Sequence, residues 1–149
     1  MKQRTRKKWM RQYKRKMKEK DTWDLSYNFA RYVLPRLKRF RQVVNGHPVK
    51  DDVKTMDDWY KVLDKIILAF DYIVDADYWW IFNPEYDYTS GLHFGSESTD
   101  KPGRSRCVIT EEDWVAPVRE KMNKEEQRRY EVIQEGLKLF AKWYMDLWW

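Results

Sequence analysis

Apolar residues recur every three or four positions between residues 22 and 44, which predicts an amphipathic α-helix. The apolar positions share one helical face: Leu25, Phe29, Tyr32, Val33, Leu37, Phe40 and Val44. Asp21 or Thr22 is the expected amino-terminal cap, since a short polar side chain accepts a hydrogen bond from the first turn. We therefore expect a first helix that buries this face in a core.

The middle and the end of this helix carry two interrupting signals. Pro35 lacks an amide hydrogen and its ring crowds the carbonyl of Arg31, so it predicts a kink or a break. The sequence Asn-Gly-His-Pro at positions 45–48 is a stop signal. Gly46 is expected there in the left-handed conformation that often ends a helix.

A second helix is predicted from Thr55 to about Val74. Thr55 and Asp58 have the spacing of a capping box, in which each side chain accepts a hydrogen bond from the other residue's amide. Apolar residues follow at helical spacing: Met56, Trp59, Leu63, Ile66, Ile67, Phe70, Ile73 and Val74.

The helical pattern is lost between about residues 83 and 109. This stretch holds three of the five glycines and two of the five prolines, which favours turns and irregular structure. We expect a long irregular loop there, with a small hairpin at residues 86–94. Loops of this length are uncommon in compact domains and are often functional.

The carboxy-terminal part of the chain predicts further helix. Thr110 is followed by three acidic residues, which is typical of a helix start, and Pro117 is expected to keep that first piece short. A terminal helix is expected from about Lys124, with one apolar face: Tyr130, Ile133, Leu137, Phe140, Tyr144 and Leu147. Gly136 lies beside this face, where its missing side chain lets another helix approach closely.

These elements predict an all-α fold, a compact bundle of three to four main helices. At 149 residues the chain has an ordinary size for one domain, and we place a single helical domain at residues 21–149. Nine Trp, ten Tyr and six Phe supply a large buried area per residue, which argues against global disorder.

A basic arm, residues 1–20, precedes this domain. It contains eleven Lys or Arg and one Glu, a net charge of +10, whereas the other residues contain nineteen basic and twenty-three acidic groups, a net charge of −4. Such a block is typical of a segment that contacts polyanions. Trp9 and Met10 precede Tyr13 by four and three residues, and Met17 follows it by four, so we expect the arm to be helical.

Nucleic-acid binding is the function that the arm favours, since Lys and Arg release counterions when they contact phosphates. Trp9 and Tyr13 are suited to stack on exposed bases. A second basic patch on the first predicted helix extends the surface. The candidate nucleic-acid-binding residues are Arg4, Arg6, Lys7, Lys8, Trp9, Arg11, Tyr13, Lys14, Arg15, Lys16, Lys18, Arg36, Lys38, Arg39 and Arg41.

The residues of the arm are also compatible with two other uses. Trp9, Tyr13 and Met17 have the spacing of a helix that docks on its own domain, and this alternative stays open. A basic helix with aromatic residues on one side also binds anionic membranes. The stripe here is narrow and lacks Leu and Ile, so no membrane partner is expected.

Residues suited to catalysis or metal binding form no recognisable pattern. His47, His93 and Cys107 are isolated, so no metal site is predicted. Nucleophile motifs and Gly-rich phosphate loops are absent from the sequence, and we expect a non-enzymatic protein without a cofactor. The second helix carries an acidic stripe: Asp57, Asp64, Asp71 and Asp75. We favour a solvated face for this stripe over a carboxylate cluster that holds a divalent ion.

Several features together predict a cytoplasmic protein. Cys107 is the single cysteine, which excludes an intramolecular disulfide and favours a reducing compartment. The chain start lacks the apolar stretch of a secretory signal. The longest uninterrupted apolar run, residues 66–70, is too short to span a membrane.

The segments TWDLSYNFARYVLPRLKRF, NGHP, DDWYKVLDKIILAFDYI and EGLKLFAKWYMDLWW together resemble small proteins of tailed bacteriophages and prophages, a group without a settled activity. The resemblance covers about residues 22–80 and 130–149. It is carried by Trp23, Pro35, Gly46, Pro48, Trp59, Phe70, Gly136, Phe140 and Trp148. The resemblance implies a phage origin, the cytoplasm of a bacterial host, and an accessory or host-takeover role, but no catalytic residues.

Three functional hypotheses follow. The leading one is a non-enzymatic, phage-type accessory protein that binds nucleic acid, or a nucleic-acid-bearing complex, through its basic arm. The alternative is a protein-interaction module that inhibits a host defence or transcription protein, since aromatic residues and Arg supply most interface hot spots. The third is a metal-dependent hydrolase that uses the acidic stripe.

Overall fold

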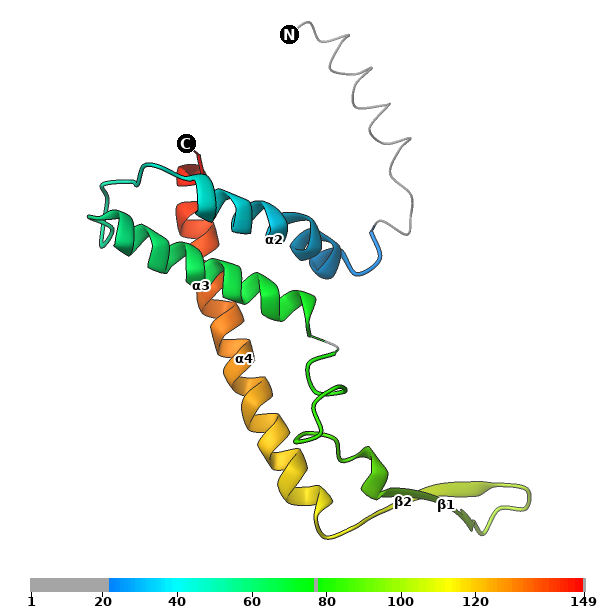
Figure 1. The fold of residues 1–149 in the computed structure, drawn as a ribbon. Helices are drawn as coiled ribbons and strands as arrows, with labels where there is room; N and C mark the ends of the chain where they lie inside the picture. The colour runs from blue at the N-terminus through cyan, green and yellow to red at the C-terminus, as the bar shows by residue number, and fades with distance from the viewer. Residues whose placement is uncertain (1–21, 77, 149) are drawn as a thin grey trace, which may run out of the picture.

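The computed structural model describes residues 22–76 and 78–148. Within these ranges three α-helices and one antiparallel two-stranded sheet build an elongated molecule (Figure 1). In chain order the elements are α2 (Leu25–Val43), α3 (Met56–Val74), the 3₁₀ turn η2 (Thr89–Gly91), β1 (Leu92–Ser98), β2 (Ser105–Glu111), α4 (Val115–Trp143) and the 3₁₀ turn η3 (Tyr144–Asp146). The fold is mainly helical, and the sheet corrects the prediction of an all-α protein.

Helix α2 runs without a break through Pro35, so the predicted break does not occur. Pro35 is exposed, and the buried residues Ala30, Leu34 and Leu37 lie on both sides of it. Packing on both sides of Pro35 therefore favours one continuous helix. Asp24, rather than Asp21 or Thr22, is the cap: its carboxylate accepts a hydrogen bond from the amide of Tyr27 at 3.4 Å.

The end of α2 differs from the expected left-handed glycine. Val44 takes an extended conformation (φ −61°, ψ 130°) while its amide still donates to the carbonyl of Phe40. Val44 is buried, so the extended turn places an apolar side chain in the core. Gly46 has no positive φ, because the helix has already ended at Val44.

Helix α3 begins as predicted. The Thr55 hydroxyl accepts a hydrogen bond from the Asp58 amide at 3.2 Å, and the Asp58 carboxylate accepts one from the Thr55 amide at 3.1 Å. The capping box is therefore confirmed.

Two apolar clusters form the core, and α3 contributes to both. The first joins α3 to α2 and consists of Ala30, Leu34, Leu37, Ile66 and Phe70. The second joins α3 to the end of α4 and consists of Val44, Val53, Trp59, Leu63 and Trp143. Trp59 and Trp143 pack edge to face, with ring centroids 5.5 Å apart. The core therefore lies where α2 and α3 cross the carboxy-terminal half of α4 (Figure 1).

Helix α4 is one continuous element of 29 residues. The predicted short piece after Thr110 and the separate start near Lys124 are both wrong. Pro117 is the third residue of α4, where an amide has no acceptor within the helix, so proline is tolerated. Thr110 instead lies in β2, opposite His93.

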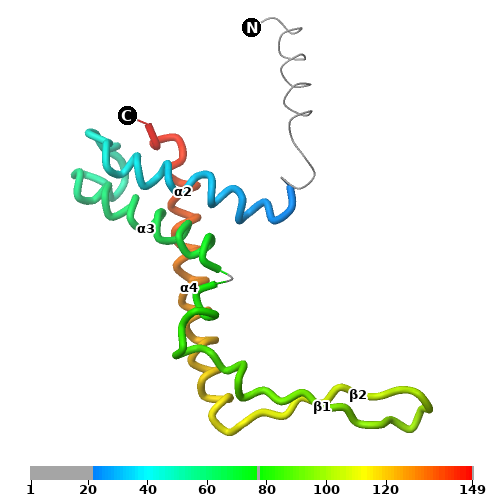
Figure 2. Tube along the Cα trace, turned by 45° about the vertical axis from the view of Figure 1, so that its right-hand side comes forward, coloured from blue at the N-terminus to red at the C-terminus, as the bar shows by residue number. Residues whose placement is uncertain are grey.

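The strands β1 and β2 form a ribbon that extends away from the helices beyond the amino-terminal end of α4 (Figure 2). The pairing runs from Leu92 opposite Glu111 to Ser98 opposite Ser105, and Gly103 in the connecting turn has a φ of 76°. The predicted irregular loop is therefore largely a hairpin. It lies later in the chain than the hairpin expected at residues 86–94.

The base of the ribbon is fastened to α4. The Glu112 amide donates to the Gly91 carbonyl at 3.1 Å. Any side chain at position 91 would collide with Val115 and Trp114, so glycine permits this contact. Val115 is fully buried as a result.

Candidate docking groove and its cationic rim

The predicted nucleic-acid-binding residues divide into two groups in the structure. Eleven of them, between Arg4 and Lys18, lie outside the described residues, as does the predicted helix of the arm. The other four, Arg36, Lys38, Arg39 and Arg41, lie on α2, where they do not form one surface.

Lys38 and Arg41 point toward α3 and are ion-paired there. The Lys38 ammonium lies 2.7 Å from the Asp71 carboxylate. The Arg41 guanidinium donates two hydrogen bonds to Asp64, at 2.9 and 3.3 Å, and lies 3.6 Å from the ring centroid of Tyr60. These cations connect α2 to α3, and their charge is neutralised in place.

Arg36 and Arg39 lie on another side of α2. Arg36 donates to the Tyr32 carbonyl at 2.6 Å and lies 3.6 Å from the centroid of the Tyr32 ring. Arg39 donates to the side-chain oxygen of Gln42 at 3.3 Å. No carboxylate within the described ranges is ion-paired with either guanidinium, so both retain their positive charge for a partner.

An apolar groove of about 740 Å³ lies beside these two arginines. Eight of its eleven lining residues come from α2, between Phe29 and Val43; the others are Phe140 on α4 and the following Tyr144 and Leu147. The lining includes two charged residues, Arg36 and Arg39, and both are cations. They form what we call the cationic rim.

No segment within residues 22–76 and 78–148 fills the groove. Phe29, Tyr32 and Tyr144 are 48%, 60% and 59% exposed, respectively. The sequence pattern had placed all three on core-facing stripes. Helix α2 carries more apolar side chains than its contact with α3 can bury. The apolar side chains left over, which are largely aromatic, line the groove.

The acidic stripe of α3 is largely used in ion pairs. Asp64 and Asp71 bind the cations of α2 described above, and Asp75 lies 3.3 Å from the guanidinium of Arg129. Asp57 is exposed. In the part of the chain that the structure describes, no group of three or more His, Cys, Asp or Glu side chains is arranged to hold a metal ion.

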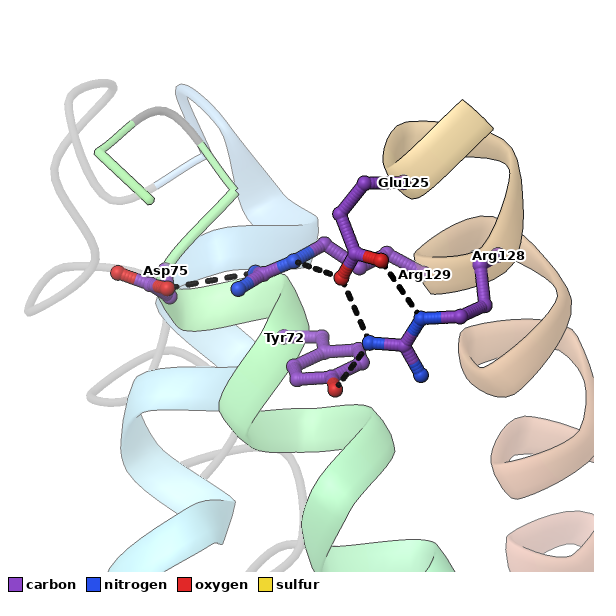
Figure 3. Close-up of polar contacts among 5 residues, drawn as sticks. All are labelled: Tyr72, Asp75, Glu125, Arg128 and Arg129. Atoms are coloured by element: carbon purple, nitrogen blue, oxygen red, sulfur yellow. Dashed lines mark hydrogen bonds and ion pairs between the residues drawn. The ribbon is translucent and has the colours of Figure 1, made fainter. Parts of the chain in front are cut away.

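A polar cluster near the end of α3 connects it to α4 (Figure 3). The Arg129 guanidinium lies 4.4 Å from the ring centroid of Tyr72 and 4.4 Å from that of Trp79. It also contacts the carboxylates of Asp75 and Glu125, at 3.3 and 3.4 Å. All these partners belong to the same chain, so this cluster holds Asp75 and Trp79 against α4 and offers little to a ligand.

Arg128 completes the cluster and favours the ionised form of Glu125. Its guanidinium donates to Glu125 at 2.6 and 2.7 Å and to the Tyr72 hydroxyl at 3.0 Å. The hydrogen bonds from Arg128 lower the pKa of Glu125, and the same contact raises the pKa of Arg128. Both groups therefore stay ionised at neutral pH.

The two histidines and the cysteine lie on separate parts of the fold. His93 on β1 lies 3.0 Å from the Glu112 carboxylate, and His47 lies 3.1 Å from the Pro48 carbonyl. Cys107 is exposed on β2. The structure does not bring the three side chains together.

None of the described helices is both long and apolar enough to cross a membrane. Comparison of the chain with protein-family models, with curated proteins and with solved structures gives no significant match.

Proposed function

We propose that this protein is a non-enzymatic nucleic-acid-binding protein. The observation that carries the proposal is the charge division along the chain: residues 1–20 have a net charge of +10 and the remainder has −4. A segment of this charge binds phosphates by releasing counterions, without reading sequence. The resemblance to phage proteins adds an accessory role in a bacterial host to the same proposal.

Two of the four basic residues of α2 in the proposed nucleic-acid site are already paired with carboxylates. Lys38 and Arg41 are engaged with Asp71 and Asp64, so a phosphate would have to displace a carboxylate from each. Arg36 and Arg39 have no such competitor among the described residues. We therefore assign the phosphate contacts of α2 to these two arginines.

A salt titration tests the proposal. Binding of labelled duplex DNA, single-stranded DNA and a structured RNA is measured at several salt concentrations for the full-length protein and for variants. The logarithm of affinity should fall linearly with the logarithm of salt, by about 0.9 for each phosphate contact on duplex DNA. Deletion of residues 1–20 should flatten this slope strongly.

Two charge-matched double variants localise the contacts on the helices. Arg36→Gln with Arg39→Gln should reduce the slope by roughly one to two units. Lys61→Gln with Lys124→Gln removes the same charge from α3 and α4 and should leave the slope nearly unchanged. Absence of binding to all three nucleic acids at low salt would refute the proposal.

Binding of a protein partner is the second candidate function. The open groove beside α2 favours it, since exposed aromatic residues next to Arg are typical of interface hot spots. In a phage setting such a partner would be a host defence or transcription protein.

A further inference from the structure

The groove between α2 and the end of α4 is an apolar surface that the described chain leaves uncovered. Phe29, Tyr32 and Tyr144 present their rings there with about half or more of their surface exposed. Apolar surface of this kind on a folded protein commonly marks a site of interaction. The shape and charge of the groove indicate the class of molecule that fits this surface.

We propose that this groove binds an acidic amphipathic α-helix of a protein partner. The partner's apolar stripe would lie on the aromatic floor, and its Asp and Glu side chains would face Arg36 and Arg39. The apolar floor is separate from the nucleic-acid contacts proposed for residues 1–20, so the protein would connect a nucleic acid to a protein. The two rim arginines are those assigned above to phosphate, so the acidic helix would displace a phosphate from α2 while the arm keeps its own contacts.

The shape of the groove favours a helix. Its α2 wall extends from Phe29 to Val43, about 21 Å or four helical turns at 1.5 Å per residue. An amphipathic helix of similar length lies along such a wall and inserts residues spaced three or four apart. A small molecule would be a poor fit, since ligand pockets usually bury most of the ligand surface, and here Tyr32 and Tyr144 stand largely in solvent.

The charge of the rim favours an acidic partner. Arg36 and Arg39 are the charged lining residues, and the nearby cations Lys38 and Arg41 are already neutralised by α3. Carboxylates flanking the partner's apolar stripe would therefore find positive charge and no competing acid. Such complementarity selects partners and directs their orientation.

The same features disfavour two other occupants. A second copy docked through this groove around a two-fold axis would bring Arg36 and Arg39 of both copies together, and like charges in an interface are unfavourable. A nucleic acid would find phosphate contacts at the rim. The rest of the lining is mainly apolar and includes Val33, Leu37 and Leu147, so it offers few hydrogen bonds to the backbone and base edges of a nucleic acid.

Three labelled synthetic peptides test the proposal with the full-length protein. The first is a helical 18-residue peptide with a Leu stripe and Glu on its other faces. The second has Lys in place of every Glu, and the third is a scrambled form of the first without the stripe. Fluorescence anisotropy should show that the first binds roughly tenfold or more tightly than either of the others. The scrambled peptide reports charge attraction alone, including attraction to the basic arm.

Substitutions at exposed ring positions localise the binding without disturbing the core. Tyr32→Ser and Tyr144→Ser should each weaken the first peptide by roughly tenfold. Tyr130→Ser is the matched control, since Tyr130 is similarly exposed at 56% but lies outside the groove. Arg36→Gln with Arg39→Gln should reduce the preference for Glu over Lys to the level that the basic arm alone produces. Urea unfolding of each variant confirms that it folds.

Several results would overturn the proposal. Equal binding of the striped and scrambled acidic peptides would show charge attraction alone. Equal effects of Tyr32→Ser and Tyr130→Ser would place the peptide elsewhere. A gain in peptide affinity of tenfold or more in the full-length variant Trp9→Ser with Tyr13→Ser would identify the arm as the occupant.

Two further measurements separate this proposal from its rivals. A dimer that Tyr144→Ser converts to monomer, measured by sedimentation, would assign the groove to a second copy. Loss of DNA or RNA binding in Tyr32→Ser would assign it to nucleic acid. Peptide binding that persists after residues 1–20 are deleted, while nucleic-acid binding falls sharply, is the expected result if the peptide binds at α2 and the arm supplies most of the nucleic-acid contacts.

Discussion

Gly136 on α4 faces Ala69 on α3 so closely that a Cβ atom at position 136 would overlap the Ala69 side chain and lie 2.9 Å from the Lys65 carbonyl oxygen. The sequence-based expectation that Gly136 admits another helix is confirmed. We expect Gly136→Ala to destabilise the protein by about 1–3 kcal/mol, because overpacking outweighs the gain in helix propensity. Urea unfolding followed by circular dichroism measures the difference.

Gly46→Ala provides the control for this substitution. A Cβ atom at Gly46 meets no atom within 4 Å, and its φ is not positive. We expect a change within about 0.5 kcal/mol, as for most exposed substitutions. If Gly136→Ala were as mild as Gly46→Ala, the close crossing of α3 and α4 would be wrong.

The ion pair between Glu125 and Arg128 predicts a pH dependence of stability. The pKa of Glu125 is lowered from its ordinary value of 4.5, chiefly by the Arg128 guanidinium. Folding therefore stabilises the ionised carboxylate. This contribution is complete above pH 4.5 and is lost as the pH falls through the lowered pKa of the folded protein. We expect it to be about 0.5 kcal/mol, since solvent screens much of the pair.

Urea midpoints at pH 6 and pH 3 measure this dependence. Glu125→Gln should lose less stability over that interval than the unmodified protein does. Glu126→Gln, one residue further along α4, is the matched control and should behave like the unmodified protein. Equal losses for all three proteins would contradict the assignment.

Arg129 is expected to hold in place the segment that follows α3, which contains Tyr78, Trp79 and Asn83. Its guanidinium contacts the rings of Tyr72 and Trp79 and pairs with Asp75. Arg129→Gln removes the charge and shortens the side chain, so we expect this segment to open more often. Hydrogen exchange at the amides of Tyr78, Trp79 and Asn83, which are hydrogen-bonded within the segment, should accelerate by about tenfold.

The internal control for Arg129→Gln is the exchange of amides in the buried part of α3. Amides near Leu63 and Ile66 should keep their exchange rates, because these residues pack in the two apolar clusters. Lys124→Gln, which removes a charge from the same helix, should leave both regions unchanged. A general acceleration would indicate loss of global stability instead of local opening.

The β-ribbon is expected to be the least stable part of the described fold. Of its strand residues, Leu92 and Val108 are partly buried and the others are exposed, and an isolated two-stranded hairpin is marginally stable in water. Amides of β1 and β2 should exchange faster than those of α3. Phe94→Ser should change the unfolding free energy by less than about 0.5 kcal/mol, whereas Phe70→Ala should cost about 3–5 kcal/mol.

Local sequence signals predicted the parts of the fold that depend on local chemistry. The Thr55–Asp58 capping box is complete within four residues, and the helix that it starts formed as expected. The prediction from Pro117 was wrong because a proline interrupts a helix interior but is tolerated in the first turn. The start of α4 was therefore predicted too late in the chain. The ribbon carried no alternating pattern because it buries neither face, so its strands looked like loop.

The groove could not be predicted for a different reason. Phe29 and Leu37 carry the same helical pattern, yet one is half exposed and the other is buried. The crossing angles of α3 and α4 on α2 decide which of these two side chains is buried. The residue pattern of a single helix does not predict those angles. The ion pairs of Lys38 and Arg41 have the same origin, since their acidic partners lie more than twenty residues away along the chain.

Helix α4 places the ribbon and the groove at its two ends. From Val115 to Phe140 a straight helix spans roughly 38 Å at 1.5 Å per residue. Because one uninterrupted helix connects the ribbon to the groove, α4 fixes the distance between these two regions. A molecule seated beside Phe140 and one held by the ribbon would be kept at a set separation, too far apart to touch unless at least one were large.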